Sequence, residues 1–300
     1  MGVDLAVATP VYLDYTLVGL EALPGPGEER FAGDLLRSPG GGAITAIGVR
    51  RLGLSAAVAA PLGTDLAGQF VREALEQEGI STGPPRDIRT PTTVVMPVAG
   101  ERAMVTVDPG ARARRGDVEA LEPRAVAVSL ELIDTAPRGV RLYVTCGDDD
   151  ARAFAKRIPS DISSASALFV NGREACVLTG AADPKDAAQE LAGLVGTVIV
   201  TLGPRGALAV VDGRSLGVPA EECGPVVDAT GAGDLFAAAY VWTDLMGADL
   251  EARLRWANLY AALSLGTPTG VGGAVDRERL TEEGRRRGLP ELPARPFESA

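Results

Sequence analysis

Residues 195–202 read VGTVIVTL and decide the fold class of the chain. The run carries apolar residues at both alternating sets of positions, so a strand formed here has no face suited to water. Strands of this kind lie inside parallel sheets whose two faces are covered by helices. We therefore place the run near the centre of a buried sheet.

Short β-branched runs alternate with helical patterns ahead of this strand. The pairs are Ala56–Ala60 with Asp65–Gln77, Arg141–Thr145 with Asp148–Arg157, and Ala167–Val170 with Glu174–Thr179. Two long helices, Gly233–Met246 and Leu250–Leu265, are predicted after it. This order predicts an α/β protein with a central, mostly parallel sheet flanked by helices on both faces.

Three strand-like pieces fall outside the alternation, namely Val11–Val18, Thr92–Val98 and Met104–Val107. We interpret them as a small β-sheet that projects from the body and serves as a lid, built from about residues 11–36 and 92–108. The chain of 300 residues is 46% hydrophobic, so residues 1–300 are expected to form a single domain with this appendage. A last helix is predicted after Asp276, followed by a poorly ordered end.

Charge and composition exclude several classes of protein. The 29 basic and 40 acidic residues give a net charge of −11 without a long basic run, which argues against nucleic acid as a partner. No uninterrupted apolar run of about 18 residues suggests a membrane span. The N-terminus carries Asp4 in its apolar run and is interpreted as a first strand, not a signal peptide. Cys146, Cys176 and Cys223 show no CxxC spacing, and a reducing cytoplasm is expected.

Two absences narrow the chemistry. The chain has no histidine, and Lys156 and Lys185 are its only lysines. Proton transfer near neutral pH must therefore involve a carboxylate, a cysteine, a tyrosine or a lysine. Neither lysine stands in a GxxxxGK[ST] pattern, so a Walker A loop is excluded. Bound phosphates would need backbone amides, arginines or a metal.

Residues 228–236, DATGAGDLF, combine such amides with a carboxylate. Gly231, Ala232 and Gly233 precede an apolar helical run, so free N–H groups and the positive end of the helix dipole meet there. Asp234 stands beside them and could accept a proton from a substrate hydroxyl. An aspartate at a helix start is also often only a cap, and the motif alone leaves both interpretations open.

A resemblance that spans nearly the whole chain favours the first interpretation. Residues 226–241, VVDATGAGDLFAAAYV, resemble the C-terminal signature D-T-T-G-A-G-D-x-F of the ribokinase-like (PfkB) carbohydrate kinases, with Ala229 in place of a threonine. Four further segments resemble family elements and occur in the family's order. These segments are GGG at 40–42 with RRLG at 50–53, residues 59–80, NGREACVLTG at 171–180 and VIVTLGPRGAL at 198–208. The resemblance implies a ribokinase-like three-layer sandwich with a β-sheet lid.

For the reaction, the resemblance implies Asp234 as the catalytic base and Gly231, Ala232 and Gly233 as an anion hole. It further implies ATP and Mg²⁺ as cofactors. Asn171 and Glu174 would organise Mg²⁺, partly through water, although Glu174 alone would be taken for a solvated helix residue. Asp228 and Thr230 match positions that shape a site for a monovalent cation such as K⁺.

For the substrates, the resemblance implies nucleotide contacts at four positions, which are Thr201, Gly203, Gly206 and Asn258. Asp14 matches an aspartate that binds sugar hydroxyls, and Gly40 and Gly41 would admit the acceptor. A carboxylate can accept two hydroxyl hydrogen bonds, which suits a polyol. The family's asparagine after the di-glycine is missing, and Thr45 or Ile44 takes its place. A glycine expected ahead of Asp14 is also missing.

These residues predict an ATP-dependent kinase that transfers the γ-phosphoryl group to a hydroxyl of a sugar or sugar-like molecule. The alternatives are a nucleoside kinase of the same fold and a non-catalytic homologue that senses a sugar or nucleotide. Arg102 could meet a charged or polar group of either acceptor, although a solvated arginine at a strand end is the more common case. A nicotinamide oxidoreductase is disfavoured, because residues 9–14, TPVYLD, carry no GxGxxG. The lid sheet also offers a surface for a homodimer.

Overall fold

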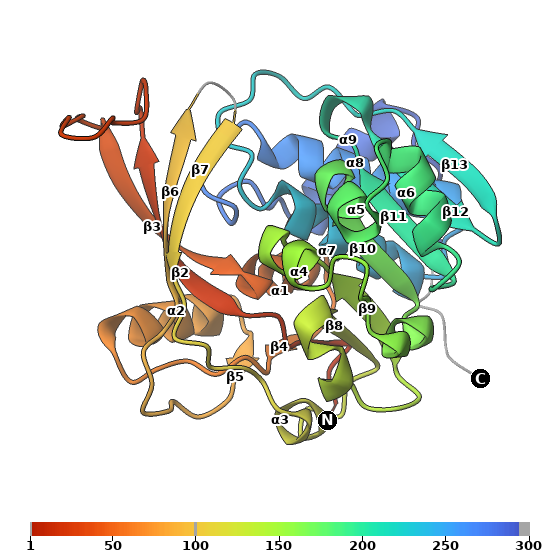
Figure 1. Ribbon diagram of the computed structural model, residues 1–300, viewed down its shortest axis with the longest axis horizontal. Helices are drawn as coiled ribbons and strands as arrows, with labels where there is room; N and C mark the ends of the chain where they lie inside the picture. The colour runs from red at the N-terminus through yellow and green to blue at the C-terminus, as the bar shows by residue number, and fades with distance from the viewer. Residues whose placement is uncertain (1, 99–100, 294–300) are drawn as a thin grey trace.

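The computed structural model describes residues 2–98 and 101–293 of the chain (Figure 1). Within them, the larger of two sheets has nine strands in the order β13-β12-β11-β10-β9-β8-β1-β4-β5. The strands from β11 to β5 are parallel to their neighbours, and β12 and β13 add an antiparallel edge. Their bounds are β1 Leu5–Val7, β4 Ala56–Val58, β5 Ser81–Thr82, β8 Ala125–Ser129, β9 Arg141–Thr145, β10 Ala167–Asn171, β11 Thr197–Thr201, β12 Ala207–Val211 and β13 Arg214–Val218.

Strand β11 is the run that decided the fold class. Its residue Ile199 belongs to the apolar core on one face of the sheet, whereas Val198 and Val200 belong to the core on the other. Since β10 and β12 flank it, the prediction of a strand buried on both faces is confirmed. Its place is third from the β13 edge, so it lies further from the centre than we predicted.

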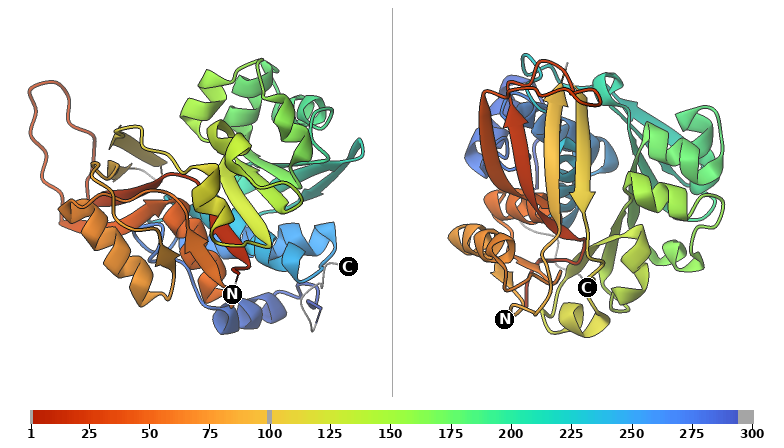
Figure 2. Two further views of the ribbon diagram at one scale, coloured as in Figure 1. Left: turned by 90° about the horizontal axis from the view of Figure 1, so that it is seen from below. Right: turned by 60° about the vertical axis from the view of Figure 1, so that its left-hand side comes forward.

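Helices cover both faces of this sheet, which confirms the three-layer arrangement (Figures 1 and 2). One core contains side chains of α1 Gly42–Arg51, α2 Leu66–Gln77, α7 Ala232–Leu245, α8 Leu250–Ser264 and α9 Arg277–Arg286. The other contains side chains of α3 Arg115–Glu119, α4 Asp148–Ala153, α5 Gly172–Thr179 and α6 Pro184–Leu191, with the 3₁₀ turns η1 Leu130–Thr135 and η2 Ser160–Ser164. The apolar runs in α7 and α8 are therefore core helices.

The second sheet, called the small sheet below, stands apart from the layers and is seen face-on in the right-hand view of Figure 2. Its strand order is β3-β2-β6-β7, with bounds β2 Val11–Val18, β3 Asp34–Gly41, β6 Thr92–Val98 and β7 Glu101–Val107. Strands β2 and β6 match the prediction. Strand β3 was missed because DLLRSPGG lacks β-branched residues, and it continues beyond residue 36.

Other boundaries needed correction. Helix α4 ends at Ala153 rather than Arg157. The apolar start of the chain forms two strands in different sheets, β1 and β2, on either side of Pro10. The predicted last helix is confirmed as α9, whereas the predicted poorly ordered end at 294–300 lies outside the described residues. No helix in the described part of the chain is long and apolar enough to cross a membrane.

Candidate active site

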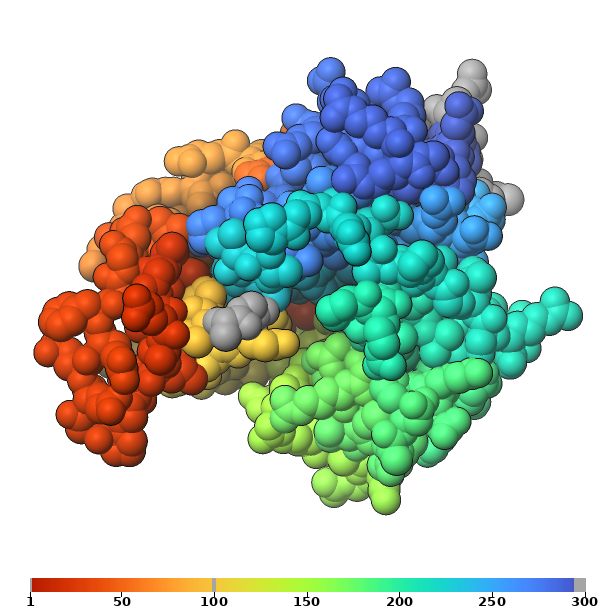
Figure 3. Space-filling view, turned by 90° about the horizontal axis from the view of Figure 1, so that it is seen from above, coloured from red at the N-terminus to blue at the C-terminus, as the bar shows by residue number. Residues whose placement is uncertain are grey.

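The residues singled out from the sequence gather where strands of the large sheet end and the small sheet begins. Asn171 and Thr201 are the last residues of the parallel strands β10 and β11, and α1 and α7 begin nearby at Gly42 and Ala232. Ligands of open α/β sheets bind at the carboxyl ends of their strands. The space-filling view shows a hollow here, between β6 and β7 in yellow and the green and teal segments (Figure 3).

The N-terminus of α7 requires a glycine at position 231. Gly231 has φ 78°, in the left-handed region, and a Cβ on it would lie 2.7 Å from Gly270 Cα and 2.9 Å from Ile44 Cδ1. Helix α7 starts directly afterwards, so amides of its first turn lack acceptors within the helix. By contrast, a Cβ on Gly233 would meet no atom within 4 Å. Gly233 thus leaves open space beside these amides.

Asp234 lies in the first turn of α7 and is only partly exposed. Burial raises the pKa of its carboxyl group to about 6, although the nearby Arg102 guanidinium opposes the rise. The Thr45 hydroxyl lies 3.5 Å from both the Asp234 Oδ1 atom and the Asp234 carbonyl oxygen. A carboxyl group with such a pKa can exchange a proton near neutral pH.

Thr45 and Ile44, the two alternatives that the sequence left open, lie in different surroundings. Ile44 packs against the Gly231 and Gly270 backbone, so its side chain belongs to the core. Thr45, one residue further along α1, points at Asp234. Of the two residues, Thr45 is the one with a polar group within reach of Asp234, and its replacement of the family's asparagine stays a prediction.

Asp14 extends from β2 of the small sheet toward Asp234. Its side chain is buried, and this burial, together with the Asp234 charge, raises the pKa of Asp14 to about 7. A Cβ on Gly40 would lie 2.1 Å from Asp14 Oδ2, so only glycine leaves room for this carboxylate. Gly41 has φ 58°, and a Cβ there would lie 2.5 Å from the Pro10 carbonyl oxygen. Both predicted glycines are thus required by close contacts.

Sequence reasoning missed a polar row that surrounds Asp14. Ser38, Asp14, Thr93 and Thr106 lie side by side, one on each strand of the small sheet. The Thr93 and Thr106 hydroxyl oxygens are 3.1 Å apart, and the Ser38 hydroxyl is buried without a partner among the described residues. The threonines of β6 and β7 were the available signal. Register across strands, which joins them into a row, was not.

Asn171 and Glu174 form a reciprocal cap at the start of α5. The Glu174 N–H donates to Asn171 Oδ1 over 2.9 Å, and the Asn171 N–H donates to Glu174 Oε2 over 2.7 Å. Burial raises the pKa of Glu174 to about 7. No cluster of three His, Cys, Asp or Glu ligands occurs within the described ranges. Mg²⁺ can be held with fewer protein ligands when water and phosphate oxygens complete its shell, and this pair fits that role.

Asp228 organises the loop before Gly231. Its two carboxylate oxygens accept from the Thr230 N–H at 2.8 Å and the Thr269 N–H at 3.0 Å, and the side chain is 3% exposed. The Thr230 hydroxyl is buried and has no partner among the described residues. A buried hydroxyl oxygen without a partner is the kind of ligand that a monovalent cation takes, and the cation site stays a prediction.

The predicted nucleotide residues are only partly brought together. Thr201 ends β11, and Gly203 in the turn η3, Gly203–Arg205, has open space at its Cβ position. Gly206 is required by packing instead, since a Cβ there would lie 2.1 Å from the Val218 carbonyl oxygen. The Asn258 amide donates to the Pro219 carbonyl oxygen over 2.9 Å, so its side chain fastens the segment after β13.

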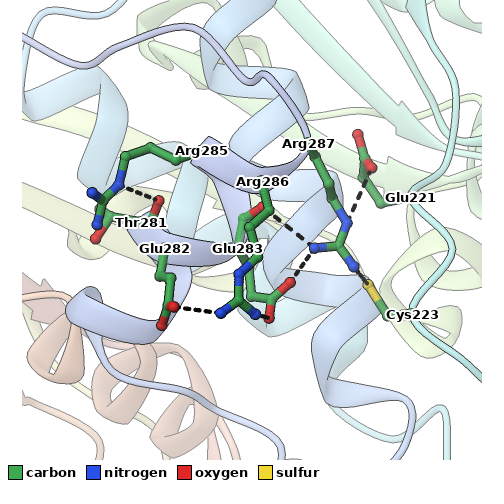
Figure 4. A network of polar contacts seen from close by, with 8 residues as sticks. All are labelled: Glu221, Cys223, Thr281, Glu282, Glu283, Arg285, Arg286 and Arg287. Carbon is green, nitrogen blue, oxygen red and sulfur yellow. Dashed lines mark hydrogen bonds and ion pairs between the residues drawn. The ribbon is translucent and has the colours of Figure 1, made fainter.

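The same segment, residues 219–227, is fastened a second time by Arg287 at the end of α9 (Figure 4). The Arg287 guanidinium bonds to Glu283 within the helix and lies 3.7 Å from the Glu221 carboxylate and 3.6 Å from the Cys223 sulfur. The segment leads directly into Asp228. Helices α8 and α9 therefore help to set where the loop at the start of α7 lies.

The chain is similar in sequence to known sugar kinases. An uncharacterised sugar kinase of Archaeoglobus fulgidus is 27% identical over 252 residues, covering 77% of this chain and 100% of that protein. Ribokinase of Bacillus subtilis is 26% identical over 280 residues, covering 86% of this chain and 92% of that protein.

Two solved structures share the fold. A ribokinase of Arabidopsis thaliana complexed with ribose and ATP superposes with a TM-score of 0.78 at 24% identity, covering 94% of this chain and 98% of that one. The adenosine kinase of Sinorhizobium meliloti superposes with a TM-score of 0.75 at 21% identity, covering 96% of this chain and 100% of that one.

The layers, the small sheet and these likenesses define a ribokinase fold. A family model described as pfkB family carbohydrate kinase matches residues 21–274, and the chain belongs to that family. Its reaction class is therefore that of a carbohydrate kinase.

Proposed function

We propose that this protein transfers the γ-phosphoryl group of ATP to a hydroxyl of a small sugar or sugar-like polyol, with Asp234 as the base. The observation that carries the proposal is the juxtaposition of Asp234 with the open backbone at Gly233 and, across the hollow, with Asp14. A carboxylate, an anion site and a hydroxyl-binding group thereby meet at one place. The chain offers no histidine for the same work.

The chemistry follows from these groups. The acceptor hydroxyl oxygen bonds to the γ-phosphorus while the bond from that phosphorus to the β–γ bridging oxygen breaks, and ADP leaves. Asp234 takes the hydroxyl proton, and Thr45 holds the Asp234 carboxylate in orientation. Backbone amides from Gly231 to Gly233 stabilise the charge on the transferring group. Bound beside Asn171 and Glu174, Mg²⁺ would supply further neutralisation of the phosphates.

The acceptor side favours a polyol. Asp14 can accept two hydroxyl hydrogen bonds, and the neighbouring Ser38 and Thr93 hydroxyls extend the polar row. A nucleoside remains the second candidate, because its ribose would present the same hydroxyls to Asp14. Both acceptor types occur among the compared proteins, since one is a ribokinase and another is an adenosine kinase.

An ADP-release screen with ATP and Mg²⁺ tests the proposal directly. Pentoses, hexoses, keto-deoxy acids and nucleosides serve as acceptors, with and without K⁺. We expect turnover with at least one polyol-bearing acceptor. ADP release by none of them, with ATP still bound, would favour a sensing homologue over a kinase.

The activity should depend on pH through carboxylates. Asp234 must be ionised to accept a proton, and its pKa is raised to about 6 while that of Asp14 is raised to about 7. We therefore expect kcat/KM to rise as pH increases through about 6 to 7 and to level off above. A pH–rate profile with the best acceptor measures this. A profile that falls across that range would contradict a carboxylate base.

Gly40→Ala should damage acceptor binding selectively. The new Cβ would lie 2.1 Å from Asp14 Oδ2, so the carboxylate must move out of place. We expect KM for the acceptor to rise about tenfold, because one charge-assisted hydrogen bond to the acceptor is lost. KM for ATP should stay unchanged. Gly116→Ala is the matched control, because a Cβ there meets no atom within 4 Å. Equal KM values for the acceptor in both variants would show that Asp14 does not contribute to acceptor binding.

The outer face of the small sheet suits a second copy of the chain. Leu35, Val94, Val105 and Val107 expose apolar side chains there, on the face opposite Asp14. Pairing of two such faces would remove this apolar surface from water. Light scattering gives the mass in solution, and a purely monomeric mass at micromolar concentration would refute the homodimer.

A further inference from the structure

Arg102 reaches from the small sheet into the candidate active site. It pairs with Pro97 across β6 and β7, which places its side chain on the same face of the sheet as Asp14 and Thr93. Its Nη1 atom donates to the Ala229 carbonyl oxygen over 3.2 Å. Ala229 belongs to the loop that runs into Gly231. The guanidinium therefore spans from one wall of the hollow to the other.

The surroundings of Arg102 are acidic. Asp14, Asp228, Glu174 and Asp234 lie close enough to affect one another's charge, and the Arg102 charge opposes the rise in the pKa of both Glu174 and Asp234. Among the described residues, no carboxylate makes an ion pair with it within 4.0 Å. An arginine carries five N–H donors in a planar fork, so most of them are left for a ligand.

We propose that Arg102 binds the γ-phosphoryl group of the nucleotide and stabilises it during transfer. The inference rests on the proposed function and adds a residue on the small sheet to it. As ATP enters, the guanidinium exchanges the Ala229 carbonyl for non-bridging γ-oxygens beside the amides of Gly231 to Gly233. A planar fork matches phosphate oxygens, and its charge acts where negative charge collects in the transition state.

An anionic group on the acceptor is the competing ligand for Arg102. The phosphoryl group is favoured because the contact of Arg102 lies in the loop of the anion site, at Ala229, and not in the polar row around Asp14. The chain has no Walker lysine, and the charge of this arginine acts on Asp234. Closure of the small sheet over bound ATP would bring the guanidinium to its ligand.

The test compares ATP-like and ADP ligands in Arg102→Met and in the control Arg37→Met. Arg37 is exposed on the opposite face of the same sheet. Calorimetry with Mg²⁺ and either the non-hydrolysable analogue AMP-PNP or ADP gives the two affinities. We expect Arg102→Met to weaken AMP-PNP about tenfold or more and to leave ADP within about twofold, with Arg37→Met like the wild type. In turnover, kcat should fall by about 10³-fold for Arg102→Met and recover partly in Arg102→Lys.

Each other outcome overturns the inference. An unchanged AMP-PNP affinity with a raised KM for the acceptor would assign Arg102 to the acceptor. Equal losses for AMP-PNP and ADP, with a lower Tm, would make the residue structural. Wild-type protein that binds neither nucleotide would refute the proposed kinase function itself, whereas wild-type binding with an unaffected Arg102→Met refutes only this inference.

Discussion

Asp234→Asn is expected to lower the rate of ADP formation by about 10³-fold with any acceptor that the wild-type protein uses, because Asn cannot accept the hydroxyl proton. The amide keeps the shape of the side chain, and the backbone amides of Gly231 to Gly233 remain in place. KM for ATP should therefore change little. A coupled ADP assay under saturating ATP and acceptor measures the loss.

The same variant should be at least as stable as the wild type. Burial raises the pKa of Asp234 to about 6, above that of an unfolded aspartate, so the folded protein holds this proton more tightly. Its stability contribution is present at pH below about 4 and is lost as pH rises through about 6. Asn carries no titrating proton, so the variant does not lose this stability as pH rises. Its Tm should therefore exceed that of the wild type by more at pH 8 than at pH 5. Undiminished ADP formation at full stability would show that another group is the base.

Thr45→Ser and Thr45→Val form the matched controls for this result. Val keeps the shape of the buried side chain but loses the hydroxyl, whereas Ser keeps the hydroxyl near Asp234 and loses only the methyl group. If Asp234 works as a base that Thr45 orients, the Ser variant should stay close to the wild type and the Val variant should lose part of the rate. A loss shared equally by both would point to packing instead.

Local patterns predicted the α/β layers and the helix start beside Asp234, but not the role of Asp234. Strand β11 could be predicted because its apolar residues face both ways, and the start of α7 because three small residues precede an apolar helix. Strand β3 could not be predicted, because its residues SPGG are held by contacts with Asp14 and Pro10. Both of these residues are distant from SPGG in the sequence. Propensity carries no information about such contacts.

The candidate site divides in the same way. Asp14 and Gly40 were found as separate positions, yet the row of Ser38, Asp14 and Thr93 exists only through the pairing register of three strands. Arg102 was suspected from its strand alone, but its bond to Ala229 joins residues far apart in the chain. Periodicity predicts which face a residue occupies. It does not predict which faces meet.

Asp244→Ala should cause a large loss of stability, of about 3 kcal/mol in the free energy of unfolding. Asp244 ends α7, is 5% exposed, and pairs with Arg141 of β9 at 2.9 Å and Arg253 of α8 at 2.5 Å. The buried Tyr143 hydroxyl also donates to its carboxylate. Truncation removes the acceptor of that hydroxyl and the partner of both arginines. Since the arginines are partly exposed, water can compensate some of the loss, which places the value at the lower end for a broken buried pair. Urea unfolding measures it, with an unchanged slope showing two-state behaviour.

Asp244→Asn separates the hydrogen bond from the charge. Its amide oxygen can still accept from Tyr143, so we expect a loss smaller than that of Asp244→Ala. Neither variant should change kcat per folded molecule, because ten residues of α7, about 15 Å, separate Asp244 from Asp234. A fall in kcat without a fall in stability would contradict this division, since it would mean that the far end of α7 controls the orientation of its first turn. An equal loss of stability in both variants would mean that the ion pairs, and not the tyrosine contact, hold α7 and α8 to β9.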